Sequence, residues 1–234
     1  MLRKSVVTFL ILGGFVACGD NTGVTTLFEV KVENISGAST AGYPIAFGSV
    51  AWALSSLNGP IFTAGQTAAD NGLEAAAEDA NLQKLLDTLQ ITDGVNLIGL
   101  AQTPTDSTEG GALLSGKTFR FVISSQQSSR LFFISTFLQG NDLFIGTPDT
   151  GIELFDADGR AITADITNQL TLFDAGTEVN ETPGSGPNQV VRQTGENAGA
   201  LESKAVGPVN DGFSYPGVGA MLRVTIAPIG ETQQ

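Results

Sequence analysis

Acidic side chains are concentrated in one part of this 234-residue sequence, between residues 141 and 181. This stretch holds nine acidic residues and a single basic residue, Arg160. Crowded carboxylates repel one another unless water, a bound cation or a proton lies between them. Binding of a hard cation is therefore the chemistry to consider first. The acidic residues are Asp142, Asp149, Glu153, Asp156, Asp158, Asp165, Asp174, Glu178 and Glu181.

Two of these acids, Asp174 and Glu178 in FDAGTEVN, are the best candidates for cation ligands. Gly176 and the neighbouring Asn and Pro residues disfavour a helix, so a loop could fold both carboxylates onto one point. Calcium needs six to eight oxygens, which usually come from more than one segment. Asp142 directly follows an apolar strand and is expected near a sheet end, where it could join them. The sequence thus predicts a Ca²⁺ or similar divalent-cation site at Asp142, Asp174 and Glu178.

Two other motifs resemble ligand sites but are better explained as turns. Residues 156–159 (DADG) match the opening of an EF-hand loop, yet the third acid is absent and Thr167 stands where the twelfth-position Glu belongs. A tight hairpin is expected there. Residues 111–118 (GALLSGKT) match the P-loop pattern, but no apolar strand precedes them and a strand-like pattern follows. We expect a turn that leads into a strand.

The bulk composition excludes several classes of function. The net charge of −13 disfavours nucleic acid and anionic lipid surfaces as partners, because both require basic residues. The sequence contains no histidine, which removes Ser-His-Asp and Cys-His catalysis and the usual zinc sites. Its single cysteine, Cys18, cannot form an internal disulfide.

The first residues read as an export signal. A basic start is followed by an apolar run at 6–16, too short to span a membrane but typical of a signal peptide. The run ends in FVAC, which resembles a bacterial lipobox. We expect a signal peptide at 1–17, a lipidated Cys18 with a tether at 18–23, and a protein held at the cell envelope. The alternative is an ordinary secretory signal in which the cysteine is incidental.

The elements that would position the acids are mostly strands. Alternating apolar residues predict strands near 26–35, 119–123 and 222–226, and RLFFISTFL at 130–138 predicts a central strand buried on both faces. Shorter strands are expected near 47–54, 151–155 and 168–173. One helical stretch at 72–90 carries a leucine stripe, with a break near Asn81. Residues 181–212 form a long polar loop. The pattern predicts a mainly β fold, an antiparallel β-sandwich with a short helical insertion.

Four stretches of the chain resemble the spondin N-terminal domain family and are closest to its bacterial members. They are WALSSLNGPIFTAGQTAADNGLEAAAEDAN, LQGNDLFIGTPDTGIELFDADG, LTLFDAGTEVNETPGSGP and DGFSYPGVGAMLRVTIAP. The resemblance implies a spondin domain at 24–230, a tail at 231–234, and a C2-like sandwich. It also implies a divalent cation bound at Asp142, Asp174 and Glu178. Two features differ from the animal members, which carry Asp at the position of Glu178 and have cysteines that this domain lacks.

Three functions remain open at this point. The first is a non-enzymatic, lipid-anchored, calcium-binding module for adhesion, with an envelope or extracellular protein or glycan as partner. The second is a hydrolase that uses Asp174 and Glu178 as a carboxylate pair on envelope polysaccharide. The sequence has one Trp and two Tyr, few for a cleft that stacks sugars. The third is a structural envelope lipoprotein whose acids are simply solvated.

Overall fold

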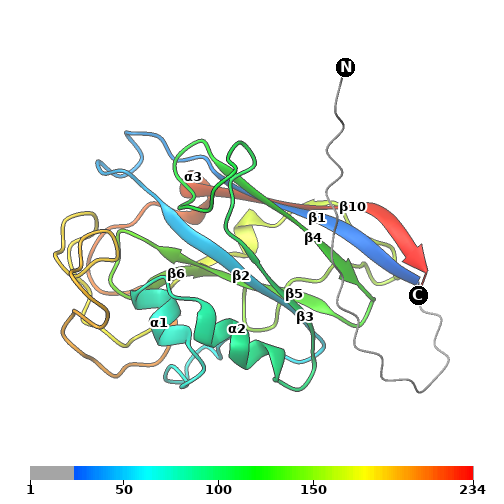
Figure 1. Cartoon of the computed structure of the whole chain (residues 1–234), viewed down its shortest axis with the longest axis horizontal. Coiled ribbons are helices and arrows are strands. Elements are labelled where there is room, and N and C mark those ends of the chain that lie inside the picture. Colours follow the sequence, from blue (N-terminus) through cyan, green and yellow to red (C-terminus); the bar gives the residue numbers. More distant parts are fainter. Residues whose placement is uncertain (1–23, 234) are drawn as a thin grey trace.

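A computed structural model describes residues 24–233 of the protein. The expected signal peptide and the tether with Cys18 lie outside the described residues. Two antiparallel sheets make up most of the domain (Figure 1). The strands are β1 (Val24–Asn34), β2 (Phe47–Ser55), β3 (Val95–Ala101), β4 (Thr118–Ser125), β5 (Arg130–Phe137), β6 (Leu143–Gly146), β7 (Ala164–Asp165), β8 (Thr171–Asp174), β9 (Gly207–Pro208) and β10 (Leu222–Gln233).

The two sheets pack face to face. One has four strands in the order β4-β1-β10-β7, and the other has six in the order β3-β2-β5-β6-β8-β9. Alternating side chains of β1 explain the packing, because Phe28, Val30 and Val32 are fully buried between the sheets. The mainly β, antiparallel sandwich expected from the sequence is confirmed.

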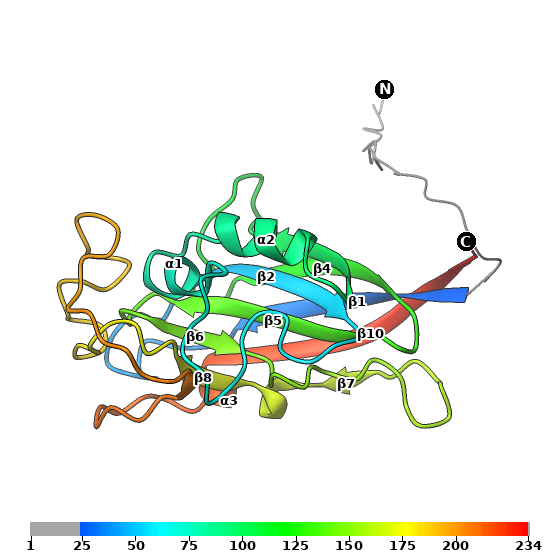
Figure 2. The same cartoon turned by 90° about the horizontal axis from the view of Figure 1, so that it is seen from below.

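The helical stretch covers the outer face of the six-stranded sheet, as Figures 1 and 2 show. It consists of α1 (Leu73–Glu78) and α2 (Gln83–Gln90), separated by the break expected near Asn81. Leucines of α2 and alanines of α1 pack on Phe132 and Ile134 of β5. Because the opposite face of β5 lies between the sheets, this strand is apolar on both faces, as predicted. The remaining helices are the short α3 (Val218–Met221) and a 3-10 turn, η1 (Thr167–Gln169).

Some local expectations were wrong. Residues 151–155 form no strand, only isolated bridges at Ile152 and Phe155 that flank a hairpin. Strand β3 was not anticipated, and it forms an edge of the larger sheet. Strand β10 continues through residues 231–233, which the sequence assigns to a tail. None of the helices in the described part of the chain is long and apolar enough to cross a membrane.

The sandwich has two distinct ends. The start of β1 and the end of β10 lie together at one end, and the long loops between β8 and α3 lie at the other (Figures 1 and 2). Strand β6 begins and strand β8 ends at this second end, where Leu143 pairs with Asp174. The acids predicted to bind a cation therefore lie far along the domain from the point where the chain enters it.

Candidate metal centre

Strand pairing brings two of the predicted ligands to neighbouring positions. Asp142 immediately precedes β6, Asp174 is the last residue of β8, and these strands are antiparallel neighbours. The backbone N–H of Ala175 donates to the carbonyl oxygen of Asp142 at 3.1 Å, which extends the pairing by one step. The expectation that Asp142 stands at a sheet end beside Asp174 is confirmed.

The Asp142 side chain is completely buried, and only one of its two carboxylate oxygens has hydrogen-bond partners. Its Oδ2 accepts hydrogen bonds from the backbone N–H groups of Thr177 and Glu178, at 2.9 and 3.0 Å. Its Oδ1 is buried and has no hydrogen-bond partner. Burial, followed by the negative charge of Asp174, raises the pKa of Asp142 to about 7. The side chain therefore has one free oxygen in a site where its own charge is costly.

Asp174 is less buried, and both of its oxygens are engaged. Oδ1 accepts from the backbone N–H of Gly176 and Oδ2 from the Asn180 side-chain amide, each at 2.7 Å. Gly176 has a positive φ of 72°, and a Cβ there would lie 2.7 Å from the carbonyl oxygen of Lys204. Burial raises the pKa of Asp174, while these two hydrogen bonds oppose the rise. Asp174 thus organises the turn that carries Glu178.

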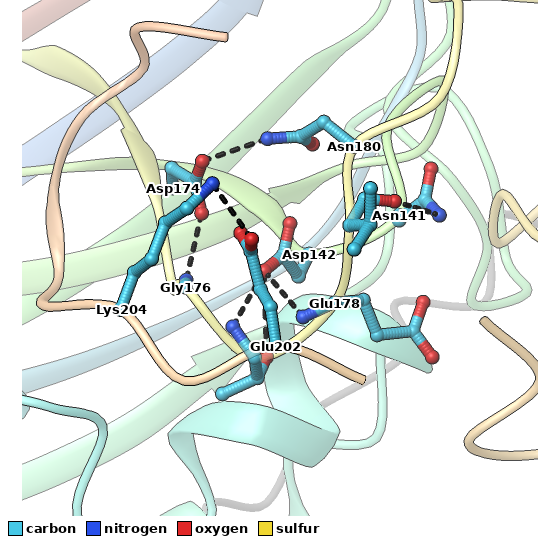
Figure 3. A network of polar contacts seen from close by, with 10 residues as sticks. Asn141, Asp142, Asp174, Gly176, Glu178, Asn180, Glu202 and Lys204 are labelled. Atoms are coloured by element: carbon cyan, nitrogen blue, oxygen red, sulfur yellow. Dashed lines mark hydrogen bonds and ion pairs between the residues drawn. The ribbon is translucent and has the colours of Figure 1, made fainter. Parts of the chain in front are cut away.

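The backbone N–H of Glu178 donates a hydrogen bond to Asp142, but the side-chain carboxylate of Glu178 points away from Asp142. Figure 3 shows this carboxylate well apart from those of Asp142 and Asp174. Its Oε1 accepts from the backbone N–H of Gly199 at 2.7 Å, and its Oε2 is buried without a partner. Burial raises the pKa of Glu178. The structure thus brings Asp142 and Asp174 together and leaves the third predicted ligand directed elsewhere.

Glu202 is a further acid close to the predicted pair. Its charge adds to the effect of burial on the pKa of both Asp142 and Asp174. One of its oxygens pairs with the ammonium of Lys204 at 2.6 Å, and the other is buried without a partner. In Figure 3 the Glu202 carboxylate is seen between those of Asp142 and Asp174. A surface pocket of about 270 Å³, lined in part by Thr177 and Glu202, opens beside it.

Glu78, the last residue of α1, was missed by the sequence analysis. It is 1% exposed, and neither of its carboxylate oxygens has a hydrogen-bond partner. Burial, together with the negative charges of Glu178, Glu74 and Asp142, raises the pKa of Glu78 to about 7, although the Thr177 hydroxyl nearby opposes the rise. No local pattern predicts this burial, because the covering chain near Gln193 lies 115 residues downstream.

The five residues Glu78, Asp142, Asp174, Glu178 and Glu202 form what we call the acidic centre. Nine buried side-chain nitrogen or oxygen atoms in the described chain lack a hydrogen-bond partner. Seven of the nine are carboxylate or amide oxygens in this region, namely both of Glu78 and one each of Asp142, Glu178, Asn180, Gln193 and Glu202. Oxygens that lack donors are the ligand type that Ca²⁺ requires. Among residues 24–233, however, no three acids already stand in a ready-made metal geometry.

The two motifs set aside as turns are turns. In residues 156–160 the Asp156 Oδ1 accepts backbone N–H groups of Asp158 and Arg160, at 2.9 and 2.8 Å. The hairpin is closed by pairing of Phe155 with Ala161. Residues 114–117 likewise form a turn that leads into β4. Both expectations are confirmed.

Comparison with known proteins gives no match, either to a protein-family model or to a curated protein. The resemblance to the spondin N-terminal domain family therefore stays a prediction that rests on the four sequence stretches. What the site can do must be argued from its own geometry. The decisive features are the complete burial of three carboxylates and the free oxygen atoms they contain.

Proposed function

We propose that the protein is a non-enzymatic binding module whose acidic centre binds a divalent cation, with Ca²⁺ as the best-fitting ion. One observation carries the proposal. Glu78, Asp142 and Glu178 are each at most 1% exposed, and each has at least one oxygen without a hydrogen-bond partner. Buried charges in proteins are paired, neutralised by a proton, or bound to metal. A cation that the Glu178 carboxylate reaches by rotating would satisfy the free oxygens of all three side chains.

The proposed ligands differ in how many free oxygens they offer and in how much they must move to bind a cation. Asp142 would bind through its free Oδ1, and Glu178 through its free Oε2 after the side chain rotates. Glu78 offers both oxygens. Asp174 stays a predicted ligand, because each of its hydrogen-bonded oxygens retains a second lone pair. Ca²⁺ accepts six to eight oxygens in flexible geometry, whereas Mg²⁺ demands a near-ideal octahedron, so this uneven set suits Ca²⁺.

The cellular role we propose is adhesion or ligand binding at the cell envelope. The lipobox-like FVAC supports a membrane anchor at Cys18, and the resemblance to spondin domains supports an extracellular or envelope protein or glycan as partner. The net charge of −13 argues against nucleic acid. Catalysis by the carboxylate pair Asp174 and Glu178 has weaker support, because Glu178 is at 0% exposure, out of reach of a substrate.

Calcium should stabilise the purified protein measurably. A ligand that binds only the folded state at a hundred times its Kd contributes about 2.7 kcal/mol to the free energy of unfolding. Each kcal/mol is worth about 2–4 °C in a domain of this size, so the melting temperature should rise by roughly 5–11 °C over that in chelator. Asp142→Asn should abolish most of this rise, which differential scanning fluorimetry with and without EGTA would measure.

The matched control for this experiment is Asp156→Asn. Asp156 holds a hairpin turn and should leave the calcium response intact. A response lost in Asp156→Asn but kept in Asp142→Asn would place the cation on the hairpin instead. If calcium has no effect on the wild-type protein, the acids are merely buried or solvated and the structural-lipoprotein alternative gains support.

Membrane attachment is tested at Cys18. Replacing it with serine removes the thiol that a lipid would modify, so Cys18→Ser should move the protein from the membrane to the soluble fraction. Metabolic labelling with a radioactive fatty acid should disappear at the same time. Labelling that persists in the Cys18→Ser protein would contradict lipidation at this residue. An unlabelled wild-type protein would support the ordinary secretory signal.

A further inference from the structure

The four edges of the two sheets are protected to different degrees. An edge strand exposes unpaired backbone N–H and C=O groups, and proteins usually protect it by keeping it very short or by placing charged residues on it. Edge strands β7 and β9 have two residues each, and edge strand β4 has eight residues that include the exposed Arg120. Edge strand β3 has seven residues, VNLIGLA, with no charged residue and no proline. Among the edges of the described sheets, β3 therefore lacks both forms of protection.

The outer edge of β3 is open to another strand. Within the described chain β3 pairs with β2 alone, and no further backbone hydrogen bond reaches residues 96–101. Leu97 and Leu100 are 40% and 37% exposed, and Asn96 is exposed as well. The backbone groups of β3 that point away from β2 are therefore free to bind the main chain of a partner.

An added strand would meet an apolar surface on the inner side of β3. Leu97 pairs with Leu54 and Gly99 pairs with Trp52, and both of these β2 side chains belong to the core between the sheets. A Cβ at Gly99 would lie 2.3 Å from the Trp52 ring, so the glycine lets the indole reach the edge strand. Trp52 in turn stacks on Phe121 of β4, with ring centroids 5.4 Å apart. Alternate apolar or β-branched side chains of an added strand would suit this surface.

A neutral pocket lies at the start of β3. It has a volume of about 440 Å³ and is lined by Leu97 of β3, Leu54 at the end of β2, and seven hydroxyl or amide side chains. The Asn96 amide donates to the hydroxyl of the buried Ser129 at 2.8 Å, which fixes one wall of the pocket. A short uncharged polar side chain would fit such a lining better than a charged one. The polar lining residues are Thr25, Ser56, Asn96, Ser124, Gln126, Ser128 and Ser129.

The charges around β3 indicate what kind of partner it suits. Exposed acids flank the strand at both ends. Asp93 precedes it by two residues, and Glu109 lies in the loop that returns to the end of β3, where the backbone N–H of Gly111 donates to the carbonyl oxygen of Gln102 at 2.9 Å. A second copy of the chain would bring a net charge of −13 against −13. A segment that is uncharged in the middle and basic at each end is the complementary partner.

We propose that β3 binds an extended segment of a partner protein as an additional strand of the six-stranded sheet. The segment would alternate β-branched and small polar residues and carry a basic residue at each end. Its backbone hydrogen bonds would supply affinity, and the apolar inner surface and the neutral pocket would supply specificity. This inference rests on the proposed binding role but not on the cation, and it leaves the loops around the acidic centre free for another ligand.

A synthetic peptide tests the docking edge directly. The probe is Lys-Thr-Val-Thr-Val-Thr-Val-Lys, acetylated and amidated at its ends, titrated into the purified full-length protein in EGTA. Trp52 is the single tryptophan of the chain and lies against Gly99, so its fluorescence should change and saturate as the peptide binds. The same peptide with its six central amides N-methylated cannot donate hydrogen bonds to β3. It should bind at least roughly tenfold more weakly, because several backbone hydrogen bonds are lost.

Two lysine substitutions form a matched pair of variants. Leu97→Lys places a charge on the unprotected edge, as natural sheets do to prevent pairing, and should weaken peptide binding at least roughly tenfold. Val122→Lys adds the same charge on edge strand β4, where Val122 is 50% exposed, and should leave peptide binding unchanged. The melting temperature shows whether Leu97→Lys still folds. If it does not, the comparison of the two peptides on the wild-type protein still decides the question.

The possible failures are distinguishable. Equal binding of the two peptides, or undiminished binding to a folded Leu97→Lys protein, would overturn docking at β3. A wild-type dimer in sedimentation equilibrium that Leu97→Lys dissociates would make a second copy the occupant and overturn the proposal of a partner segment. Absence of peptide binding together with stabilisation by calcium would overturn this inference and leave the proposed cation site standing. Peptide binding in a protein that calcium does not stabilise would support the docking edge and overturn the cation site alone.

Discussion

In calcium-free buffer, the free energy of unfolding is expected to fall by several kcal/mol as the pH rises from 4 to 8. The cause is the burial of Glu78 and Asp142, whose pKa values are each raised to about 7. In the unfolded chain these groups titrate near 4. One pKa unit corresponds to about 1.4 kcal/mol, so shifts of this size amount to several kcal/mol together.

The sign follows from proton binding. Below pH 4 both carboxyls are protonated in the folded and the unfolded protein, and they impose no electrostatic penalty. Between pH 4 and 7 the folded protein holds more protons than the unfolded chain, so stability falls as the pH rises. Above pH 7 both groups are ionised in either state, and the loss is complete. Urea unfolding at a series of pH values in EGTA would measure this slope.

Calcium should flatten the same curve. A bound cation neutralises the ionised carboxylates, so its stabilising effect should be large at pH 8 and small at pH 5, where protons compete for the same oxygens. A calcium-free protein whose stability rises between pH 5 and pH 7 would contradict the assignment of Glu78 and Asp142 as unpaired buried acids. It would indicate that the pH dependence of the free energy of unfolding is dominated by other groups, whose ionisation stabilises the folded state.

Glu78→Gln is expected to stabilise the calcium-free protein at pH 8 while removing most of its response to calcium. Glutamine has nearly the same shape as glutamate and carries no charge to bury, so the penalty at this position disappears. The gain should be on the order of 3 kcal/mol, from the shift of the pKa of Glu78 to about 7. The loss of calcium response follows because two of the free oxygens belong to Glu78.

The control is Glu74→Gln, on the same helix. Glu74 lies in the first turn of α1 and is exposed, so its neutralisation should change stability by less than about 1 kcal/mol and leave the calcium response intact. Asp174→Asn completes the series, since a strong loss of calcium response there would restore Asp174 as a principal ligand. A marked destabilisation of Glu78→Gln at pH 8 would argue that the carboxylate is paired rather than free.

The sequence predicts the parts of the fold that local pattern determines. Alternation in residues 26–35 predicts β1, and the run at 130–138, which is apolar on both faces, predicts β5. Successive residues of a strand point to opposite faces, so their polarity shows which faces are buried. The run VNLIGLA of β3 has no clear alternation and forms an edge strand. Residues 151–155 alternate weakly, and their pairing is limited to bridges beside a hairpin.

The residues of the site, like the elements of the fold, could be predicted only where local sequence pattern determines their position. Asp142 and Asp174 could be placed together because each adjoins an apolar strand, and neighbouring strands end at one edge. Glu78 could not be placed, because the apolar face of α1 is formed by Leu73, Ala76 and Ala77 and the glutamate is buried by chain from far downstream. The direction of the Glu178 carboxylate depends equally on a distant partner, Gly199. Tertiary coverage of this kind leaves no periodic signal in the sequence.

The place of β1 in its sheet has a mechanical consequence. If Cys18 anchors the chain as proposed, force from the membrane would reach the start of β1, while a partner bound at the loops between β8 and α3 would pull on the opposite end of the sandwich (Figures 1 and 2). Strand β1 is an inner strand, paired with β10 from Val24 to Asn34 and with β4 from Thr26 to Glu33. Antiparallel hydrogen bonds run perpendicular to the strands, so such a pull would shear both ladders at once instead of opening them one bond at a time. Under the proposed anchoring, this pairing would let the domain withstand tension between the membrane and a bound partner.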